Sequence, residues 1–506
     1  MRKPLLSLVA VALVAVGCSG ASASYPASGN TPPEPQHHQA TPQPAPPEST
    51  PYDGLTYQDP GVNPYVDPDE DRVSTFALDV DTASYTIAQR YIADGNRPDP
   101  ASVRIEEWVN AFDQGYRPPA DDDFAVTVDG GPTPFFEDDE LLVRIGLQAR
   151  AVRERAREDA SLTFVIDTSG SMEREGRLEL VKDALRILVD ELGPNDRVAV
   201  VSFGQDARLV LRSTSARDRD AILGAIDELQ PDGSTNLAAG LRLGYEQARE
   251  SLTENGIDRV ILASDGVANV GLTGADEILR RIREDAAAGI ELVSVGVGMG
   301  NYNDVLLEQL ADQGDGFYAY VNGVDEAKTL FRDELTSTLQ TVALDARAQV
   351  EFDPDLVTAY RLVGYENRAI DDHAFTDPDV DAGAIGAGHA VTALYAVRLR
   401  DGVNEGDRLA TVRVRWADPD DGRSRELARE VTGEDLARSF ASTDPHFRFD
   451  AIVAATAEVL RDSTFSRRTD LEDILRVADE ESGGLPATDE VHDFLDLLDA
   501  AARLEG

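Results

Sequence analysis

The chain has 506 residues, which suggests roughly three domains, and 42% of them are hydrophobic, so packed cores can form and global disorder is excluded. The formal net charge is −47, which argues against a nucleic-acid partner and against a polybasic attachment to anionic lipid. Lysine occurs only three times, so the surface is acidic and Lys-poor. This composition suits a salt-adapted host, although a high-GC genome, which also replaces Lys by Arg, explains it equally well.

The chain begins like a secreted protein. Arg2 and Lys3 precede a short apolar run over residues 5–16, and the only cysteine, Cys18, follows Gly17. This segment resembles a bacterial lipobox, so we expect residues 1–17 to be a signal peptide and Cys18 to be lipidated. The alternative is an ordinary signal peptide in which the cysteine is there by chance. On the first interpretation the protein is extracytoplasmic and reaches the membrane through its lipid anchor only.

Residues 18–71 are rich in Pro, Ser, Thr and Gln, and we expect them to form an extended tether. Residues 72–158, an N-terminal flanking region, then read as a strand, two helices and alternating strands at 123–130 and 139–150. Within this region Asp79 and Asp81 are spaced as in an aspartyl-nucleophile phosphatase. That family expects Thr or Val where Ala83 stands, so a strand-to-helix turn is the better interpretation.

Residues 159–341 alternate between apolar strands and amphipathic helices. Strands over 161–166, 196–203 and 258–264 are almost continuously apolar, which is typical of parallel strands that are buried on both faces. The alternation therefore predicts an α/β fold, with a doubly wound, mostly parallel sheet and helices on both faces. In such sheets ligands bind at the carboxyl ends of the strands.

Oxygen-bearing side chains follow the strands at that edge. Asp167, Ser169 and Ser171 come directly after the first strand, Thr235 precedes a helix, and Asp265 follows a later strand. These loops offer two carboxylates and several hydroxyls, without nitrogen or sulfur, and this ligand set suits a hard cation such as Mg²⁺, with Mn²⁺ or Ca²⁺ as alternatives. Hydroxyl ligands neutralise little of the charge of the ion, which can then accept an acidic group from a partner.

The pattern Asp167-x-Ser169-x-Ser171, then Thr235, then Asp265, resembles the metal-ion-dependent adhesion site of von Willebrand factor A (VWA) domains. The resemblance implies that Ser169, Ser171 and Thr235 contact the ion, and that Asp167 and Asp265 act directly or through water. The alternative is an ordinary strand-to-helix turn in which Asp and Ser are caps. We expect Asp167 to lie on a solvent-facing loop, so that its removal costs only modest stability.

Residues 342–433 are β-rich, and residues 434–506 are helical. The strands on both sides of the VWA segment need a second layer, and the simplest arrangement is one β-sandwich built from both flanks with the VWA domain inserted. The strings TFALDVDTASY, VRIEEWVNAFD and YRLVGYENR resemble those of the YfbK-type bacterial VWA lipoproteins. In that family, dedicated N- and C-terminal regions surround the VWA domain.

The sequence thus predicts a membrane-anchored protein that binds an acidic (Asp or Glu) group of a protein partner through the metal. We expect no enzymatic activity and no small-molecule cofactor, because no catalytic string other than the weak Asp79–Asp81 match is present. The alternative is a structural protein of the envelope whose metal only stabilises the fold.

Overall fold

The computed structural model describes residues 57, 59–78, 82–137, 139–152, 157–253, 256–265, 275–298, 304–333, 339–377, 382–466 and 468–505. The predicted signal peptide, Cys18, most of the tether, and Asp79 and Asp81 lie outside these residues. Within the described ranges, no helix combines the length and the apolar character that a membrane crossing requires.

The VWA domain is built on a six-stranded sheet in the order β6-β5-β4-β7-β8-β9. Neighbouring strands are parallel except β6, which pairs antiparallel with β5 at one edge. Strand β4 is buried along its whole length, as the continuous apolar run predicted. The strands are β4 (Ala160–Asp167), β5 (Arg197–Phe203), β6 (Ala207–Ser215), β7 (Ile257–Ser264), β8 (Ile290–Val297) and β9 (Tyr318–Val321).

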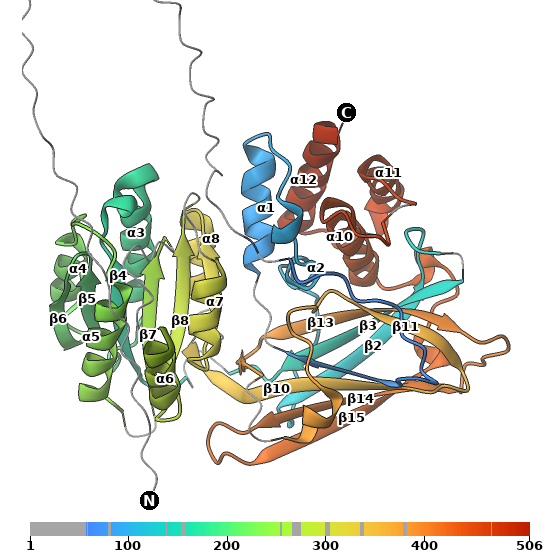
Figure 1. Ribbon diagram of the computed structural model, residues 1–506, viewed down its shortest axis with the longest axis horizontal. Helices are drawn as coiled ribbons and strands as arrows, with labels where there is room; N and C mark the ends of the chain where they lie inside the picture. Colours follow the sequence, from blue (N-terminus) through green and yellow to red (C-terminus); the bar gives the residue numbers. More distant parts are fainter. Residues whose placement is uncertain are drawn as a thin grey trace, which may run out of the picture. The chain divides into compact units, whose positions relative to one another are not determined.

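Helices cover both faces of this sheet (Figure 1). In β4, Phe164 and Ile166 pack into one core, while Val165 packs into the core on the opposite face. The first core contains side chains of α3 (Arg177–Glu191), α4 (Arg219–Asp227) and α8 (Val324–Lys328). The second contains side chains of α5 (Leu237–Glu250), α6 (Ala275–Ala286) and α7 (Asp304–Asp312). The predicted doubly wound α/β fold is confirmed.

The flanking regions together form a β-sandwich of two antiparallel sheets. The first sheet has the order β1-β10-β14-β15, with β12 also paired to β10, and the second has the order β11-β13-β3-β2. Strands β1 (Val73–Ala77), β2 (Phe124–Pro132) and β3 (Glu140–Ala149) precede the VWA domain in the chain. The others follow it: β10 (Thr341–Phe352), β11 (Val357–Val363), β12 (Ala384–Gly386), β13 (Ala390–Leu399), β14 (Arg408–Ala417) and β15 (Ser424–Thr432). Each sheet therefore needs strands from both flanks, as predicted.

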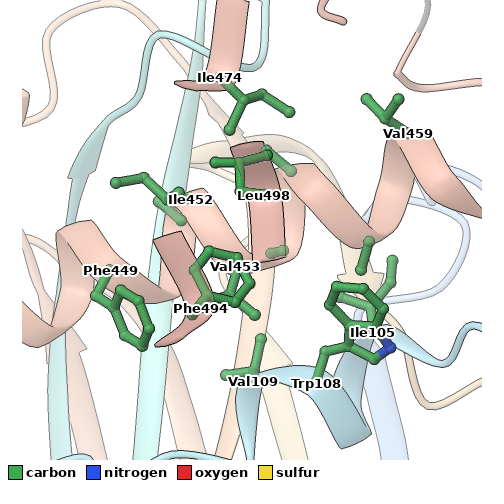
Figure 2. Packing of buried hydrophobic residues seen from close by; sticks show 14 of the residues in the cluster. Ile105, Trp108, Val109, Phe449, Ile452, Val453, Val459, Ile474, Phe494 and Leu498 are labelled. Atoms are coloured by element: carbon green, nitrogen blue, oxygen red, sulfur yellow. The ribbon is translucent and has the colours of Figure 1, made fainter. Parts of the chain in front are cut away.

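A layer of helices covers the outer face of the second sheet. It consists of α1 (Ala83–Ala93) and α2 (Ile105–Val109) from the N-terminal flank, with α10 (Pro445–Leu460), α11 (Leu471–Glu481) and α12 (Asp489–Glu505) from the C-terminus. Helix α10 lies in the middle and is buried on all sides, and most of its side chains are accordingly apolar, although it also buries Arg448, Asp450 and Glu458. Figure 2 shows Ile452 and Val453 of this helix among Phe494, Leu498 and Trp108.

Two features depart from the boundaries that the sequence suggested. Residues assigned to the end of the tether already belong to the fold: Val66 and Tyr360 exchange two backbone hydrogen bonds, at 2.8 and 3.0 Å, and the Asn63 amide donates to the Gly364 carbonyl at 2.7 Å. Strand β15 was not among the strands the sequence indicated, because it is an edge strand with mostly exposed charged side chains.

The N-terminal flank also contacts the VWA domain. Ala83, Ile87 and Tyr91 of α1 belong to the same buried cluster as Tyr318 and Tyr320 of β9. Polar contacts accompany this packing, since Glu308 of α7 accepts hydrogen bonds from Arg104 at 3.1 Å and from Arg368 at 3.0 Å. The VWA domain therefore shares part of its core with the surrounding body.

Candidate functional site

The strand register brings the first and last predicted loops to one edge of the VWA sheet. Asp167 is the last residue of β4, and the pairing of Ile166 with Ala263 places the end of β7 beside it. The Ser264 hydroxyl donates a hydrogen bond to Asp167 Oδ2 at 2.7 Å, and Asp265 follows directly. Both aspartates are fully buried.

Backbone hydrogen bonds tie the Thr235 loop to the same edge. The amide of Gly170 donates to the carbonyl of Gly233 at 3.0 Å, and the amide of Asn236 donates to that of Gly204 at 2.8 Å. Gly204 has to be glycine, because a Cβ atom there would lie 2.0 Å from the carbonyl oxygen of Asp232. The loops after β4, after β5 and before α5 are thereby interlocked at the carboxyl end of the sheet.

The two serine hydroxyls of the first loop lie against each other, with Ser169 Oγ 3.0 Å from Ser171 Oγ. Asp167 Oδ1 accepts the backbone N–H of Ser169 at 2.8 Å, which fixes the turn. The Ser169 side chain, by contrast, makes no capping hydrogen bond to the helical turn that follows it. The interpretation as an ordinary capped turn therefore accounts in part for Asp167. It does not account for the Ser169 hydroxyl, which does not cap the helical turn.

Two buried oxygen atoms of the site have no hydrogen-bond partner among the described residues: Thr235 Oγ1 and Asp265 Oδ1. Leaving a buried polar atom without a partner costs free energy, so such atoms in a native fold call for a ligand or water. Burial also raises the pKa of Asp167 to about 6, with a smaller contribution from the nearby Asp265, and the hydrogen bonds from Ser264 and Ser169 oppose this rise. A bound cation would give the two oxygen atoms a partner and would lower the pKa of Asp167.

Arg177, in the first turn of α3, is a component of the site that the sequence analysis did not identify. Its side chain is buried, and Nη1 donates to Asp265 Oδ2 at 2.9 Å. Gly298 leaves room for this side chain, because a Cβ atom there would lie 2.3 Å from Arg177 Nε. Nothing in the spacing of the sequence marks this arginine, since its contact comes from the loops at the ends of β7 and β8 rather than from its own helix.

The environment of Asp167 corrects one expectation. Asp167 was expected on a solvent-facing loop, but its exposed fraction is 0% and its two oxygens accept hydrogen bonds from Ser169 and Ser264. The residue ends a central strand, and the neighbouring loops cover it. Removal of its side chain would leave two donors unpaired, so Asp167→Ala should cost more stability than a surface substitution.

The candidate site contains two carboxylates and three hydroxyls. Within the described ranges, no group of three or more His, Cys, Asp or Glu side chains is placed to hold a metal ion, so a cation here would depend on the hydroxyls of Ser169, Ser171 and Thr235. The all-oxygen donor set, the buried carboxylates and the two unpartnered oxygens fit a hard divalent cation.

Family models, relatives and solved structures are similar to parts of this chain. The family model for the von Willebrand factor type A domain matches residues 161–333, the one described as "Uncharacterized protein YfbK, C-terminal" matches residues 337–504, and one described as "von Willebrand factor" matches residues 52–144. A human relative, inter-alpha-trypsin inhibitor heavy chain H2, is 27% identical over 171 residues, which are 32% of this chain and 18% of that protein. A solved structure, a von Willebrand factor type A protein from Catenulispora acidiphila, covers 76% of this chain and 91% of its own, with a TM-score of 0.45 and 18% identity.

The uncharacterized protein YfbK of Escherichia coli K12 is similar over nearly the whole folded chain. It is 34% identical over 461 residues, which cover 85% of this chain and 78% of that relative. The family models together match the VWA domain and most of both flanks that form the sandwich. The chain therefore belongs to the YfbK family of proteins with a von Willebrand factor type A domain.

Proposed function

We propose that this protein binds a protein partner through a divalent cation, Mg²⁺ by preference, at the carboxyl edge of the VWA sheet. Ser169, Ser171 and Thr235 would hold the ion with their hydroxyls, and Asp167 and Asp265 would hold it directly or through water. When bound, the ion supplies an electrophilic position for a carboxylate oxygen of the partner. The observation that carries the proposal is the pair of buried oxygens, on Thr235 and Asp265, that no described residue satisfies.

Asp167, Arg177 and the three hydroxyls would play different roles in the proposed metal site. Asp167, fixed by the N–H of Ser169 and the hydroxyl of Ser264, orients the first loop. Arg177 holds one oxygen of Asp265 and leaves the other toward the site. The three hydroxyls contribute no charge, so two carboxylates face a dication and no surplus of negative charge repels an acidic partner.

We propose further that the protein is not an enzyme and acts outside the cytoplasm, anchored by a lipid on Cys18. The donor set of the candidate site, two carboxylates and three hydroxyls, suits the binding of a hard cation. The anchor proposal depends on the sequence of the first 18 residues. It predicts that Cys18→Ala releases the protein from membranes or leaves the precursor uncleaved, and unchanged membrane fractionation with normal cleavage would contradict it.

A structural role is the second candidate, in which the cation only stabilises the fold of an envelope protein. The burial of both aspartates favours this alternative, because an ion would relieve their desolvation without any partner. The two candidates differ in one respect: only the first requires that capture of a partner be lost on chelation.

The decisive experiment uses two matched threonine variants. Thr235 and Thr163 both carry a buried hydroxyl without a hydrogen-bond partner among the described residues, but Thr163 lies within β4, away from the predicted loops. Replacing either residue by valine keeps the volume and removes a hydroxyl that contributes no hydrogen bond, so both variants should fold with nearly unchanged stability. Calorimetric titration should show Mg²⁺ affinity reduced by about tenfold or more in Thr235→Val and unchanged in Thr163→Val.

Partner capture from membrane extracts, with Mg²⁺ or with EDTA, then separates the two functions. Adhesion requires that wild type and Thr163→Val retain a partner in Mg²⁺ and lose it in EDTA, and that Thr235→Val fails to retain it. If wild type and Thr235→Val bind Mg²⁺ alike, the site is misassigned. If their Mg²⁺ affinities differ but both retain the same partner, the metal is structural.

A further inference from the structure

The loops that carry the candidate metal site also carry exposed carboxylates. Glu173 lies in the turn after β4, Asp206 in the loop after β5, and Asp232 in the loop before α5, and all three residues are exposed. Backbone hydrogen bonds hold these segments together, since the Asp232 amide donates to the Thr168 carbonyl and the Thr168 amide donates to the Phe203 carbonyl. The three carboxylates therefore border one site, and we call them the acidic rim.

The charge of the acidic rim is not compensated by the described part of the chain. Glu173, Asp206 and Asp232 make no ion pair with any described residue. The bases nearest to them in sequence, Arg174 in the same turn as Glu173 and Arg208 in β6, are exposed and do not pair with them. Interactions between exposed charges more than about 8 Å apart are largely screened at physiological ionic strength, so these local charges matter more to a partner than the net charge of the chain.

The interior of the site differs from its rim. Inside, a dication would face the two carboxylates of Asp167 and Asp265, and Arg177 already pairs with the second of them. The buried, unpartnered hydroxyl of Thr235 belongs to the same loop as Asp232, and it indicates independently of the rim that a ligand binds here. A carboxylate that approached on its own would thus be attracted by the ion and repelled by the acidic rim.

We propose that the partner presents its metal-binding carboxylate within a basic segment, so that Lys or Arg side chains beside it pair with the acidic rim. The inference rests on the proposed function, because the metal is what binds the carboxylate. Complementary charges of this kind determine which partner is accepted. A second copy of this chain does not suit the rim, since the net charge is −47 and lysine occurs only three times. The acidic rim therefore selects a basic partner of a different sequence.

The test uses three short synthetic peptides and the full folded chain, with ligand-observed NMR titration as the measurement. The probe is acetyl-Gly-Lys-Glu-Lys-Gly amide, and its two controls replace the lysines by serine or the glutamate by glutamine. We expect the probe to bind in Mg²⁺ and not in EDTA, and the glutamine peptide not to bind. The serine peptide should bind about fivefold more weakly than the probe, because it lacks two exposed ion pairs.

Two double variants locate the charge selection. Asp206→Asn with Asp232→Asn removes two rim charges whose side chains make no ion pair, so folding and Mg²⁺ affinity should change little. The matched control is Asp218→Asn with Asp220→Asn, which removes two exposed charges at the start of α4. Strand β6 runs antiparallel to β5, so α4 begins at the opposite end of the sheet. The preference for the lysine peptide should fall to about twofold or less in the rim variant and stay at about fivefold in the control.

The outcomes distinguish this inference from the proposed function. Equal affinity for the lysine and serine peptides in Mg²⁺ would overturn the inference and leave the metal site intact. A preference for lysine that persists in the rim variant, or that is lost equally in the control, would also overturn the inference alone. If no peptide binds in Mg²⁺, or if the lysine peptide binds equally well in EDTA, the carboxylate does not reach a metal, and the proposed function fails together with the inference.

Discussion

Two regions of the molecule bury aspartate side chains, and they differ in how the charge is matched. In the flanking body, Asp450 of α10 accepts a hydrogen bond from Arg144 at 2.9 Å, and the same guanidinium holds both oxygens of Asp129, at 2.9 and 2.6 Å. At the edge of the VWA sheet, Asp167 and Asp265 are equally buried, but Asp167 is held by the hydroxyl of Ser264 and the backbone N–H of Ser169, while Arg177 pairs with Asp265. The first cluster has a permanent cation in Arg144.

We interpret a buried aspartate that is paired with an arginine of the chain as part of the fold, and a buried aspartate without such a pair as a candidate ligand for a bound cation. In the flanking body the cation belongs to the chain, so the carboxylates are compensated as soon as the sheet and α10 meet. In both regions an arginine reaches one oxygen of an aspartate, Asp265 or Asp450, and the other oxygen has no partner among the described residues. The regions differ in Asp167, for which the described residues provide no ion-pair partner. A buried carboxylate that no cation of the described chain compensates is a reason to expect a cation to bind there.

Of the changes predicted below, expressing the two regions as separate fragments should have the largest effect on folding. Residues 342–433 alone lack β1, β2 and β3, so the sheet β11-β13-β3-β2 would lose half of its strands and expose its core. We expect this fragment to aggregate or remain unfolded, because unpaired strand edges and apolar faces associate. Residues 159–341 contain the whole VWA sheet and should fold alone, although they lose the cover that α1 provides. Circular dichroism melting and size-exclusion chromatography of both fragments check this, and cooperative melting of a monomeric 342–433 fragment would contradict it.

Removing the permanent cation should have the next largest effect. Arg144→Met leaves Asp450 buried without its ion-pair partner, and such a change costs about 3–5 kcal/mol of unfolding free energy. The matched control is Arg413→Met, which breaks a partly exposed pair with Glu351 in the same sandwich and should cost about 0–1 kcal/mol. Urea unfolding of both variants measures the difference. Equal losses would show that the Arg144 cluster is no more important to folding than a surface pair.

The sequence was sufficient for much of this architecture because its apolar patterns are strong. Continuous apolar strands such as residues 161–166 and the helical character of residues 434–506 can be read without a structure. The strands predicted on both sides of the VWA domain lacked a second layer, and that alone indicated a joint sandwich. Strand β15 could not be found in this way, since an exposed edge strand with charged side chains carries no apolar pattern.

The candidate site was predictable only as far as its residues follow strands. The sequence placed Asp167, Ser169, Ser171, Thr235 and Asp265 at one edge, and the loops that carry them do meet there. The burial of Asp167 was not predictable, because it results from neighbouring loops that close over the strand end. Arg177 escaped notice for a similar reason: its partner Asp265 is 88 residues away in sequence.

The pH dependence of metal binding should sharpen the comparison. Burial raises the pKa of Asp167 from 3.8 to about 6, so the metal-free fold binds a proton that the unfolded chain releases. The stability that this proton contributes is present at low pH and is lost as the pH rises from about 4 to about 6. Mg²⁺ requires the ionised carboxylate, so its affinity should fall by up to about tenfold per pH unit below about pH 6. Titrations at about pH 5 and about pH 7.5 check this, and an affinity that is independent of pH would remove Asp167 from the ligand set.

The smallest expected effect tests whether Arg177 limits the affinity of the site. Its guanidinium lies 2.9 Å from Asp265 Oδ2 and would repel a dication bound beside that carboxylate. Arg177→Gln should therefore lower the melting temperature of the metal-free protein, since Asp265 loses its partner, and tighten Mg²⁺ binding by about three- to tenfold. Saturating Mg²⁺ should restore most of the lost stability, because the ion then takes over the role of the arginine. Arg177→Lys keeps the charge and should bind Mg²⁺ like the wild type. If Arg177→Gln instead binds Mg²⁺ more weakly, the arginine orients Asp265 for the metal, and the open oxygen at the VWA edge depends on a cation of the chain just as Asp450 depends on Arg144.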